Sequence, residues 1–285
     1  MDIAAALKQY GFVGTLANSI PELRTILSRA AAGNWTADEF SRAVQDSKWW
    51  KGSADAVKQY QILKATKPGE WRAQQDVLHR KTISLAAEMG VAASAPQLGH
   101  LTVLAQMHGW DEATLRSQIG HLLRRGGQTY GGQAGEIQQQ IRQLYYDMGI
   151  RYNSATVNDR VRAVLSGVST IQNVTALVQQ QAKTAFPALA AQIDAGHTVR
   201  QIADPYIQAK AQLLEQAPET VTLADPLVRR GLSYKDPKTA QIGLMPLWQY
   251  EQQVKADPKW QQTKNAHDDY ATLAHQIGRD WGFAS

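Results

Sequence analysis

Apolar residues recur every three or four positions along most of this 285-residue chain. That is the spacing of α-helices that bury one face. The pattern predicts helices over six long segments, at residues 53–66, 70–89, 133–148, 171–193, 198–215 and 258–281. The alternation that is typical of a strand is confined to short patches such as ETVTL at 219–223. We therefore expect an all-α protein.

One spacing occurs twice, in SIPELRTILSRAAAGNWTADEF at 19–40 and in SAPQLGHLTVLAQMHGWDEATL at 94–115, which begin 75 residues apart. Each stretch opens with Ser, any residue, Pro, Glu or Gln, and Leu. In each, Trp follows that Leu by 12 positions, and apolar residues follow the Trp by 5 and 9 positions. The apolar positions of this repeat are Leu23, Phe40 and Val44 in the first copy and Leu98, Leu115 and Ile119 in the second.

The shared polar residues are signals of helix starts and ends. Ser or Thr with Glu or Gln three positions later forms a capping box, and Pro is tolerated in the first helical turn. Gly favours the left-handed residue that ends a helix. We expect capping boxes at Ser19–Glu22, Thr36–Glu39 and Ser94–Gln97, a cap at Asp111, and helix ends at Gly33 and Gly109.

A weaker third copy covers residues 153–178, with Asn at the cap, Val at the apolar positions and Ser169 in place of Trp. Each copy follows an apolar–Gly–apolar triplet, in which the glycine suits the end of the preceding helix. These triplets are Tyr10-Gly11-Phe12, Met89-Gly90-Val91 and Met148-Gly149-Ile150, and the chain closes on Trp281-Gly282-Phe283. The pattern predicts a multi-helix array of degenerate modules, although chance reuse of ordinary caps is the alternative.

Glycine and proline predict how the chain is divided. The segment GGQTYGGQAG at 126–135 has five glycines in ten residues, so we expect a flexible linker there. It would join N-terminal helical modules at 1–125 to a C-terminal helical region at 136–285, which is irregular at 216–247 and ends in a terminal helix. Pro187 should interrupt its helix. Asp-Pro pairs at 204–205, 225–226, 236–237 and 257–258 should start helices.

Composition limits the class of protein. Hydrophobic residues make up 44% and charged residues 19%, which is typical of a globular chain. The net charge of +5 is spread out, with 15 basic and 11 acidic residues at 1–125 and 15 and 14 after that. A nucleic-acid-binding protein usually concentrates its charge, so nucleic acid is not the expected partner. The absence of cysteine excludes disulfides. No apolar run predicts an integral membrane segment, and the first residues lack a secretory signal pattern.

No catalytic motif occurs in the chain. None of the seven histidines belongs to an HExxH pair, and no nucleophile elbow or phosphate-binding loop is present. Neighbours on a helix diverge, so His267, Asp268 and Asp269 should not converge on one ion. Glu70 beside Trp71 is the nearest approach to a carboxylate against an aromatic ring, but Glu is also favoured in a first helical turn. We expect no catalytic residue, metal or cofactor, and no enzyme activity.

Tryptophan residues are the candidates for protein interaction. Trp49 and Trp50 are adjacent, so on a helix they cannot both face the same core. Trp71, Trp248 and Trp260 raise the same question, because an aromatic side chain can anchor a partner as well as a core. The alternative is that all five pack within the core or between modules.

Three parts of the chain resemble helical virion proteins of phages that infect actinobacteria, of the Streptomyces type, which are described as minor tail or virion proteins. They are GFVGTLANSIPELRTILSRAAAGNWTADEFSRAVQDSKWW, DPLVRRGLSYKDP and LWQYEQQVKADPKWQQTKNAHDDYATLAHQIGRDWGF. The residues that carry the resemblance are Trp35, Trp49-Trp50, Asp225-Pro226, Asp236-Pro237, Trp260 and Trp281-Gly282. The resemblance implies no catalytic residues.

The resemblance implies a non-enzymatic structural protein of a phage virion, made in the host cytoplasm. It would be associated with the tail, at the tip or in the lumen, would contact other tail proteins, and would be oligomeric in the particle. A virion-internal or ejected protein that contacts DNA or membrane through its mild positive charge is the alternative. A peptidoglycan-active enzyme is a third and weaker hypothesis.

Overall fold

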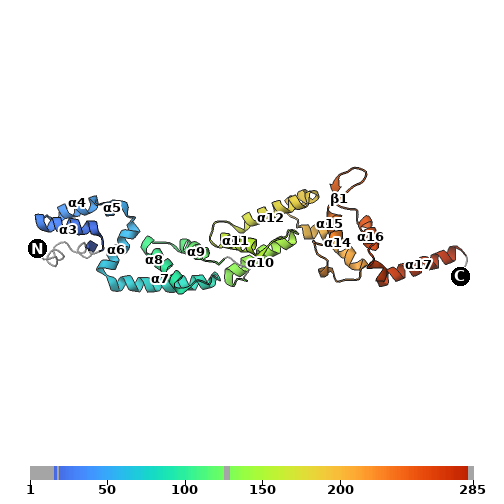
Figure 1. The fold of residues 1–285 in the computed structure, drawn as a ribbon, viewed down its shortest axis with the longest axis horizontal. Coiled ribbons are helices and arrows are strands. Elements are labelled where there is room, and N and C mark those ends of the chain that lie inside the picture. The colour runs from blue at the N-terminus through green and yellow to red at the C-terminus, as the bar shows by residue number, and fades with distance from the viewer. Residues whose placement is uncertain (1–15, 18, 125–128, 282–285) are drawn as a thin grey trace. The chain divides into compact units, whose positions relative to one another are not determined.

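The computed structural model describes residues 16–17, 19–124 and 129–281, and helices make up 73% of them (Figure 1). Their strands are a single antiparallel pair, so the expected all-α fold is confirmed. Contacts divide the chain into two compact units. Unit 1 is Met1–Glu136 with Val161–Val168, and unit 2 is Ile137–Arg160 with Ser169–Ser285.

The helices of unit 1 are α3 (Pro21–Gly33), α4 (Ala37–Asp46), α5 (Lys48–Gly52), α6 (Asp55–Thr66), α7 (Pro68–Glu88), α8 (Ala95–His108) and α9 (Glu112–His121). Both α10 (Gly132–Asp147) and α11 (Ser154–Leu165) contribute residues to both units. Unit 2 continues with α12 (Ile171–Ala185), η1 (Pro187–Leu189), α13 (Ala190–Asp194), α14 (Val199–Leu213), η2 (Pro218–Thr220), α15 (Pro226–Leu232), β1 (Tyr234–Lys235), β2 (Ile242–Gly243), α16 (Leu247–Lys255), η3 (Trp260–Gln262) and α17 (Lys264–Asp280).

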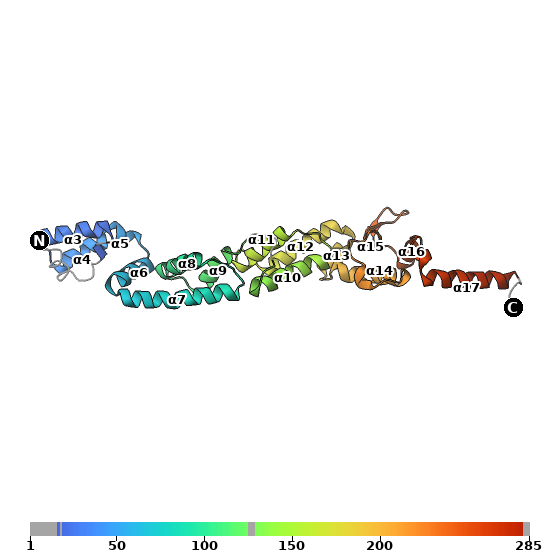
Figure 2. The same cartoon turned by 60° about the horizontal axis from the view of Figure 1, so that its bottom comes forward.

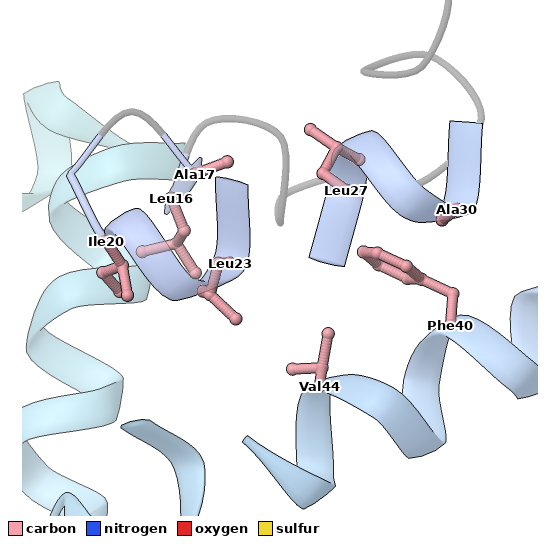
Figure 3. Close-up of a cluster of buried hydrophobic side chains, with 8 residues drawn as sticks. All are labelled: Leu16, Ala17, Ile20, Leu23, Leu27, Ala30, Phe40 and Val44. Atoms are coloured by element: carbon pink, nitrogen blue, oxygen red, sulfur yellow. The ribbon is translucent and has the colours of Figure 1, made fainter. Parts of the chain in front are cut away.

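The apolar positions of the repeat form the cores. In the first copy, Phe40 and Val44 of α4 face Leu23 and Leu27 of α3 (Figure 3), and all four are buried. The corresponding residues of the second copy are buried where α7, α8 and α9 lie side by side (Figure 1, Figure 2). The Val residues of the third copy are buried as well. The repeat therefore marks the side chains that each helix turns inward.

Most of the predicted helix signals are confirmed. The capping boxes of Thr36 and Ser94 form, and Asp111 caps α9 by accepting from the amide of Thr114 at 2.8 Å. Gly109 has the expected left-handed backbone, with φ of 61°. The exit glycines Gly90 and Gly149 also have positive φ. The corresponding Gly11 and Gly282 lie outside the described residues.

The capping box predicted at Ser19 is wrong, because α3 begins at Pro21 and its N-cap residue, Ile20, has no side-chain cap. The Glu22 carboxylate instead accepts hydrogen bonds from the amides of Lys48 and Trp49, each at 2.9 Å. Those two N–H groups belong to the start of α5. The same sequence signal thus serves a different helix, one that lies beside α3 in the folded chain.

The first helix of the module ends at Gly33, as predicted, but the left-handed residue is the one that follows this glycine. Asn34, with φ of 52°, takes the left-handed position, and Gly33 is the last residue of α3. Asn tolerates this backbone. Gly33 has another role, because a Cβ atom there would lie 2.7 Å from the indole nitrogen of Trp35. The glycine lets the Trp35 ring fold back against the helix end.

Part of the glycine-rich segment allows two backbones to approach closely. Residues 126–128 lie outside the described residues, whereas Gly132–Gly135 form the first turn of α10. The Ala134 amide donates to the Met89 carbonyl at 3.1 Å. A Cβ atom at Gly90 would lie only 1.8 Å from the Gly131 carbonyl oxygen. The predicted division of the chain at 126–135 stays a prediction.

The Asp-Pro pairs have four different outcomes. Asp225 caps α15 as expected, by accepting from the amides of Leu227 and Val228. The pair at 204–205 lies inside α14, so the helix start predicted there is wrong; a box of Thr198 and Gln201 starts that helix. The pair at 236–237 forms the turn between β1 and β2, because Asp236 accepts from amides within the turn. The pair at 257–258 precedes η3.

Two other predictions concern unit 2. Pro187 does break its helix, since α12 ends at Ala185 and η1 follows. The ETVTL patch at 219–223 forms no strand. Its first residues belong to η2, and Val221 and Leu223 are buried.

Candidate functional site

The adjacent tryptophans Trp49 and Trp50 are both half-buried against the core of α3 and α4. Their rings meet edge to face, with centroids 5.7 Å apart. The Trp49 indole donates to the side-chain oxygen of Gln61 at 2.7 Å, and the Lys58 ammonium lies 4.8 Å from the Trp50 ring centre. Both rings therefore help to join α5 to α6, and each keeps an exposed part.

Trp71 and Trp260 pack inside their units. Trp71 is half-buried, and its ring meets Tyr60 edge to face at 6.1 Å. Trp260 is buried and packs against Tyr270 of α17 at 5.7 Å. Neither indole nitrogen has a hydrogen-bond partner among the described residues. Trp260 offers little surface for a partner.

Trp248 is the candidate that faces solvent, with 67% of its surface exposed. It lies in the first turn of α16, just after the β1–β2 hairpin. Three further apolar side chains of this region, Ile242, Leu244 and Leu247, are exposed as well. We refer to these four residues as the hairpin patch.

A second exposed apolar surface runs along α17, and it was not among the interaction candidates predicted from the sequence. Every described side chain from His267 to Trp281 is exposed. Four of them, spaced by three, four and four residues, are large and apolar: Tyr270, Leu273, Ile277 and Trp281. This spacing places them on one helical face, and we refer to them as the α17 stripe. The spacing was visible in the sequence, but it does not tell whether the face is covered.

A buried polar cluster supports the start of α15. The Lys210 ammonium forms an ion pair with the Asp225 carboxylate. Burial opposes the charge of Asp225, but the Lys210 partner and the backbone amides of α15 outweigh it and lower the pKa of the carboxyl. Burial raises the pKa of Tyr206 and, more strongly, that of Tyr250. The Tyr206 hydroxyl donates to the Met245 carbonyl at 2.6 Å. These groups hold α14, α15 and α16 together.

Unit 2 also contains an open cleft of about 350 Å³ between the end of α10 and the segment that leads into α15. Tyrosine and arginine side chains dominate its polar lining: Tyr145, Tyr146, Arg151, Tyr152 and Arg229. Leu223 and Ile150 supply apolar surface. The sequence showed Tyr145-Tyr146 and Arg151-Tyr152 as two pairs, but only the fold adds Arg229.

Two further arginines bind the tyrosines of this cleft. Arg160 donates to the Tyr145 hydroxyl at 2.7 Å, and Arg200 donates to the Tyr146 hydroxyl at 2.6 Å. The Arg200 guanidinium also lies 4.8 Å from the Tyr146 ring centre. Tyr145 is fully buried, whereas more than 40% of Tyr146 and of Tyr152 is exposed. These two arginines thus help to orient two aromatic rings at the cleft.

The remaining chemical candidates are surface groups. Glu70 forms an exposed ion pair with Lys67 at 3.1 Å, and Asp269 forms one with Lys255 at 2.7 Å. In the described part of the chain, no three His, Asp or Glu side chains form a group that could hold a metal ion. No helix there is both long enough and apolar enough to cross a membrane.

Searches of protein-family models, of curated proteins and of solved structures gave no match to the chain.

Proposed function

We propose that this chain is a non-enzymatic component of a phage virion, associated with the tail, and that it acts through contacts with other virion proteins. The setting rests on the resemblance of the three segments named above. The observation that supports a role in assembly is the α17 stripe, an apolar face whose four side chains are 41–73% exposed in the described chain, although the Tyr270 ring also meets that of Trp260.

An amphipathic helix whose apolar face stays exposed to water gains little stability from that face. A single helix of this length is only marginally stable in water, and most helices are stabilised by packing their apolar face. Each large apolar side chain that becomes fully buried contributes about 1.5–3 kcal/mol. A partner surface that covers Leu273 and Ile277 would therefore stabilise both the helix and the complex.

The charges of α17 favour a protein partner over an anionic membrane. The helix has two basic residues, Lys264 and Arg279, and three acidic ones, Asp268, Asp269 and Asp280. Helices that lie on anionic lipid usually have a basic polar face, because it attracts the headgroups. The acidic excess of α17 would weaken that attraction. We therefore assign the stripe to an apolar surface of another virion protein.

Photocrosslinking within assembled particles tests this proposal. A photoreactive amino acid is placed at Leu273, in the stripe, or at Thr272, which lies on the opposite face of the same helix. The particles are purified before irradiation, and the crosslinked protein is identified by mass spectrometry. We expect crosslinks to one defined virion protein from position 273 and few from position 272.

Two outcomes contradict the proposal. If the chain is absent from purified particles, the virion setting is wrong. If it is present but positions 272 and 273 crosslink equally to many proteins, α17 is not an assembly surface. A reconstruction of the particle supplies an independent check, since ordered copies in the tail would locate α17 directly.

A further inference from the structure

The cleft beside α10 carries an excess of positive charge. Arg151 and Arg229 line it, and Arg160 and Arg200 bind two tyrosines of its lining. None of these four arginines forms an ion pair with a carboxylate of a described residue. Arg160 and Arg200 donate to tyrosine hydroxyls instead. The Arg229 guanidinium lies over the Phe186 ring, 5.2 Å from its centre. A guanidinium bound by aromatic groups keeps its full charge, so the cleft attracts an anion.

The lining also favours a flat apolar group. Tyr146 and Tyr152 are both half-exposed, and the Tyr152 ring rests at 5.1 Å from that of the buried Tyr145. Tyrosine faces that are held in place in this way provide surfaces on which a planar ring can stack. The cleft volume of about 350 Å³ lies at the lower end of small-ligand sites, which begin near roughly 300 Å³.

We infer that this cleft binds one nucleotide unit of a single-stranded nucleic acid. The base would stack on the exposed tyrosine rings, and the phosphate would face Arg151 and Arg229. Guanidinium groups suit phosphate because they donate two parallel hydrogen bonds to it. A base within a duplex is already stacked on both sides, so the site should prefer single strands.

A nucleotide fits the lining better than an acidic peptide does. Carboxylate side chains would satisfy the arginines but would leave the tyrosine faces without a planar partner. A nucleotide supplies the anion and the ring together. This site is separate from the α17 stripe, and a result at one does not decide the other.

Arg229 and Arg230 provide a matched pair of variants on one helix. They are neighbours in α15 and lose the same charge on substitution by Gln, but only Arg229 lines the cleft. The measurement is fluorescence anisotropy of a labelled oligothymidylate, titrated with the full chain at several salt concentrations. We expect Arg229→Gln to weaken binding about fivefold or more and to reduce the salt slope by about 0.7, the value for one phosphate contact on a single strand. Arg230→Gln should change the affinity by less than about twofold, since it makes no such contact.

Arg151→Gln keeps the test valid if Arg229→Gln destabilises the fold, because the Arg151 side chain is exposed and makes no hydrogen bond or ion pair with another described residue. It should weaken binding to a similar extent. Tyr152→Leu should weaken binding at every salt concentration without changing the salt slope, because stacking releases no counterions.

The inference is overturned if Arg230→Gln and Arg229→Gln weaken binding equally, since binding would then follow net charge alone. It is also overturned if a duplex of the same length binds as tightly as the single strand. Equal competition by polyglutamate would assign the cleft to acidic peptides. No binding at about 50 mM salt, where phosphate contacts are strong, would leave the cleft without this function.

Discussion

The substitution Gly90→Ala tests the contact between the end of α7 and the start of α10. Gly90 has φ of 72°, a left-handed backbone. A Cβ atom there would lie 1.8 Å from the carbonyl oxygen of Gly131, whereas real Cβ atoms essentially never come within 3.0 Å of a heavy atom beyond their own and the adjacent residues. The two backbones must therefore move apart if any side chain is introduced.

The expected cost follows from three effects. An L-residue in the left-handed region costs about 1–2 kcal/mol relative to glycine. Separating the backbones introduces strain of about 1–3 kcal/mol, as overpacked sites show. The hydrogen bond from Ala134 to Met89 lies at this contact, and its loss costs about 1 kcal/mol. Together these effects should lower the free energy of unfolding of Gly90→Ala by about 3–6 kcal/mol.

Gly99→Ala is the matched control. Gly99 lies within α8, and a Cβ atom there would meet nothing within 4 Å. Replacing a glycine in a helix interior by alanine should stabilise the protein by about 1 kcal/mol. The two substitutions add the same methyl group and should have opposite effects on stability.

Urea unfolding followed by circular dichroism measures both variants. Because the chain has two units, hydrogen exchange at the Ala134 amide identifies the transition that involves this contact. The reasoning is refuted if Gly90→Ala is as stable as the wild type while Gly99→Ala behaves as expected. Loss of protection at Ala134 without a change in stability would show that the contact opens cheaply.

Three further predictions concern other contacts. The amides of Lys48 and then Trp49 lower the pKa of Glu22. The stability that this carboxylate contributes is therefore present above its ordinary pKa and is lost as the pH falls through the lowered pKa. Glu22→Gln should make the midpoint of urea unfolding less dependent on pH between about pH 5 and 3. Lys210→Met should cost about 2–3 kcal/mol in urea unfolding, because it leaves a partly buried carboxylate without its ion-pair partner. Trp35→Ala and Trp110→Ala should each lower the free energy of unfolding by about 2–3 kcal/mol. This is less than for a fully buried Trp, because both rings are half-buried. A loss of stability below about 1 kcal/mol at both sites would contradict the view that they are equivalent hinges.

The two copies of the repeat show how far local sequence signals can be trusted. Ser94 and Gln97 form the expected box, but the matching pair at Ser19 and Glu22 does not. A capping box is predicted from residues that are close in the sequence. The Glu22 carboxylate instead accepts hydrogen bonds from two amides at the start of α5. That partner lies 26 residues away in the sequence, so only the folded arrangement could reveal it.

The glycine-rich segment shows a second limit. Glycine is equally suited to flexible chain and to backbones in close contact. Composition alone favoured a linker at 126–135, whereas Gly131 and Gly132 lie against the end of α7. Two glycines that face each other from distant segments, such as Gly90 and Gly131, would have to be known as neighbours before the contact could be predicted.

The candidate surfaces were only partly predictable for a related reason. Tryptophan is equally useful in a core and at an interface, and the structure separates buried Trp260 from exposed Trp248. The apolar spacing of the α17 stripe could be read from the sequence. That it lacks a cover could not, because burial depends on every other segment of the chain.

The repeated and the unrepeated parts of the sequence differ in how much apolar surface they expose. In all three copies, the apolar positions of the repeat are buried, so the repeat maintains the cores and leaves little of itself for a partner. The exposed side chains lie elsewhere: eight of the 14 exposed large hydrophobic residues in the described chain fall between 242 and 281. Selection on the modules would preserve the scaffold, whereas selection on this last part would preserve the contacts. Substitutions on the outer faces of the first two modules should therefore leave assembly intact, and substitutions in the hairpin patch or the α17 stripe should impair it without unfolding either unit.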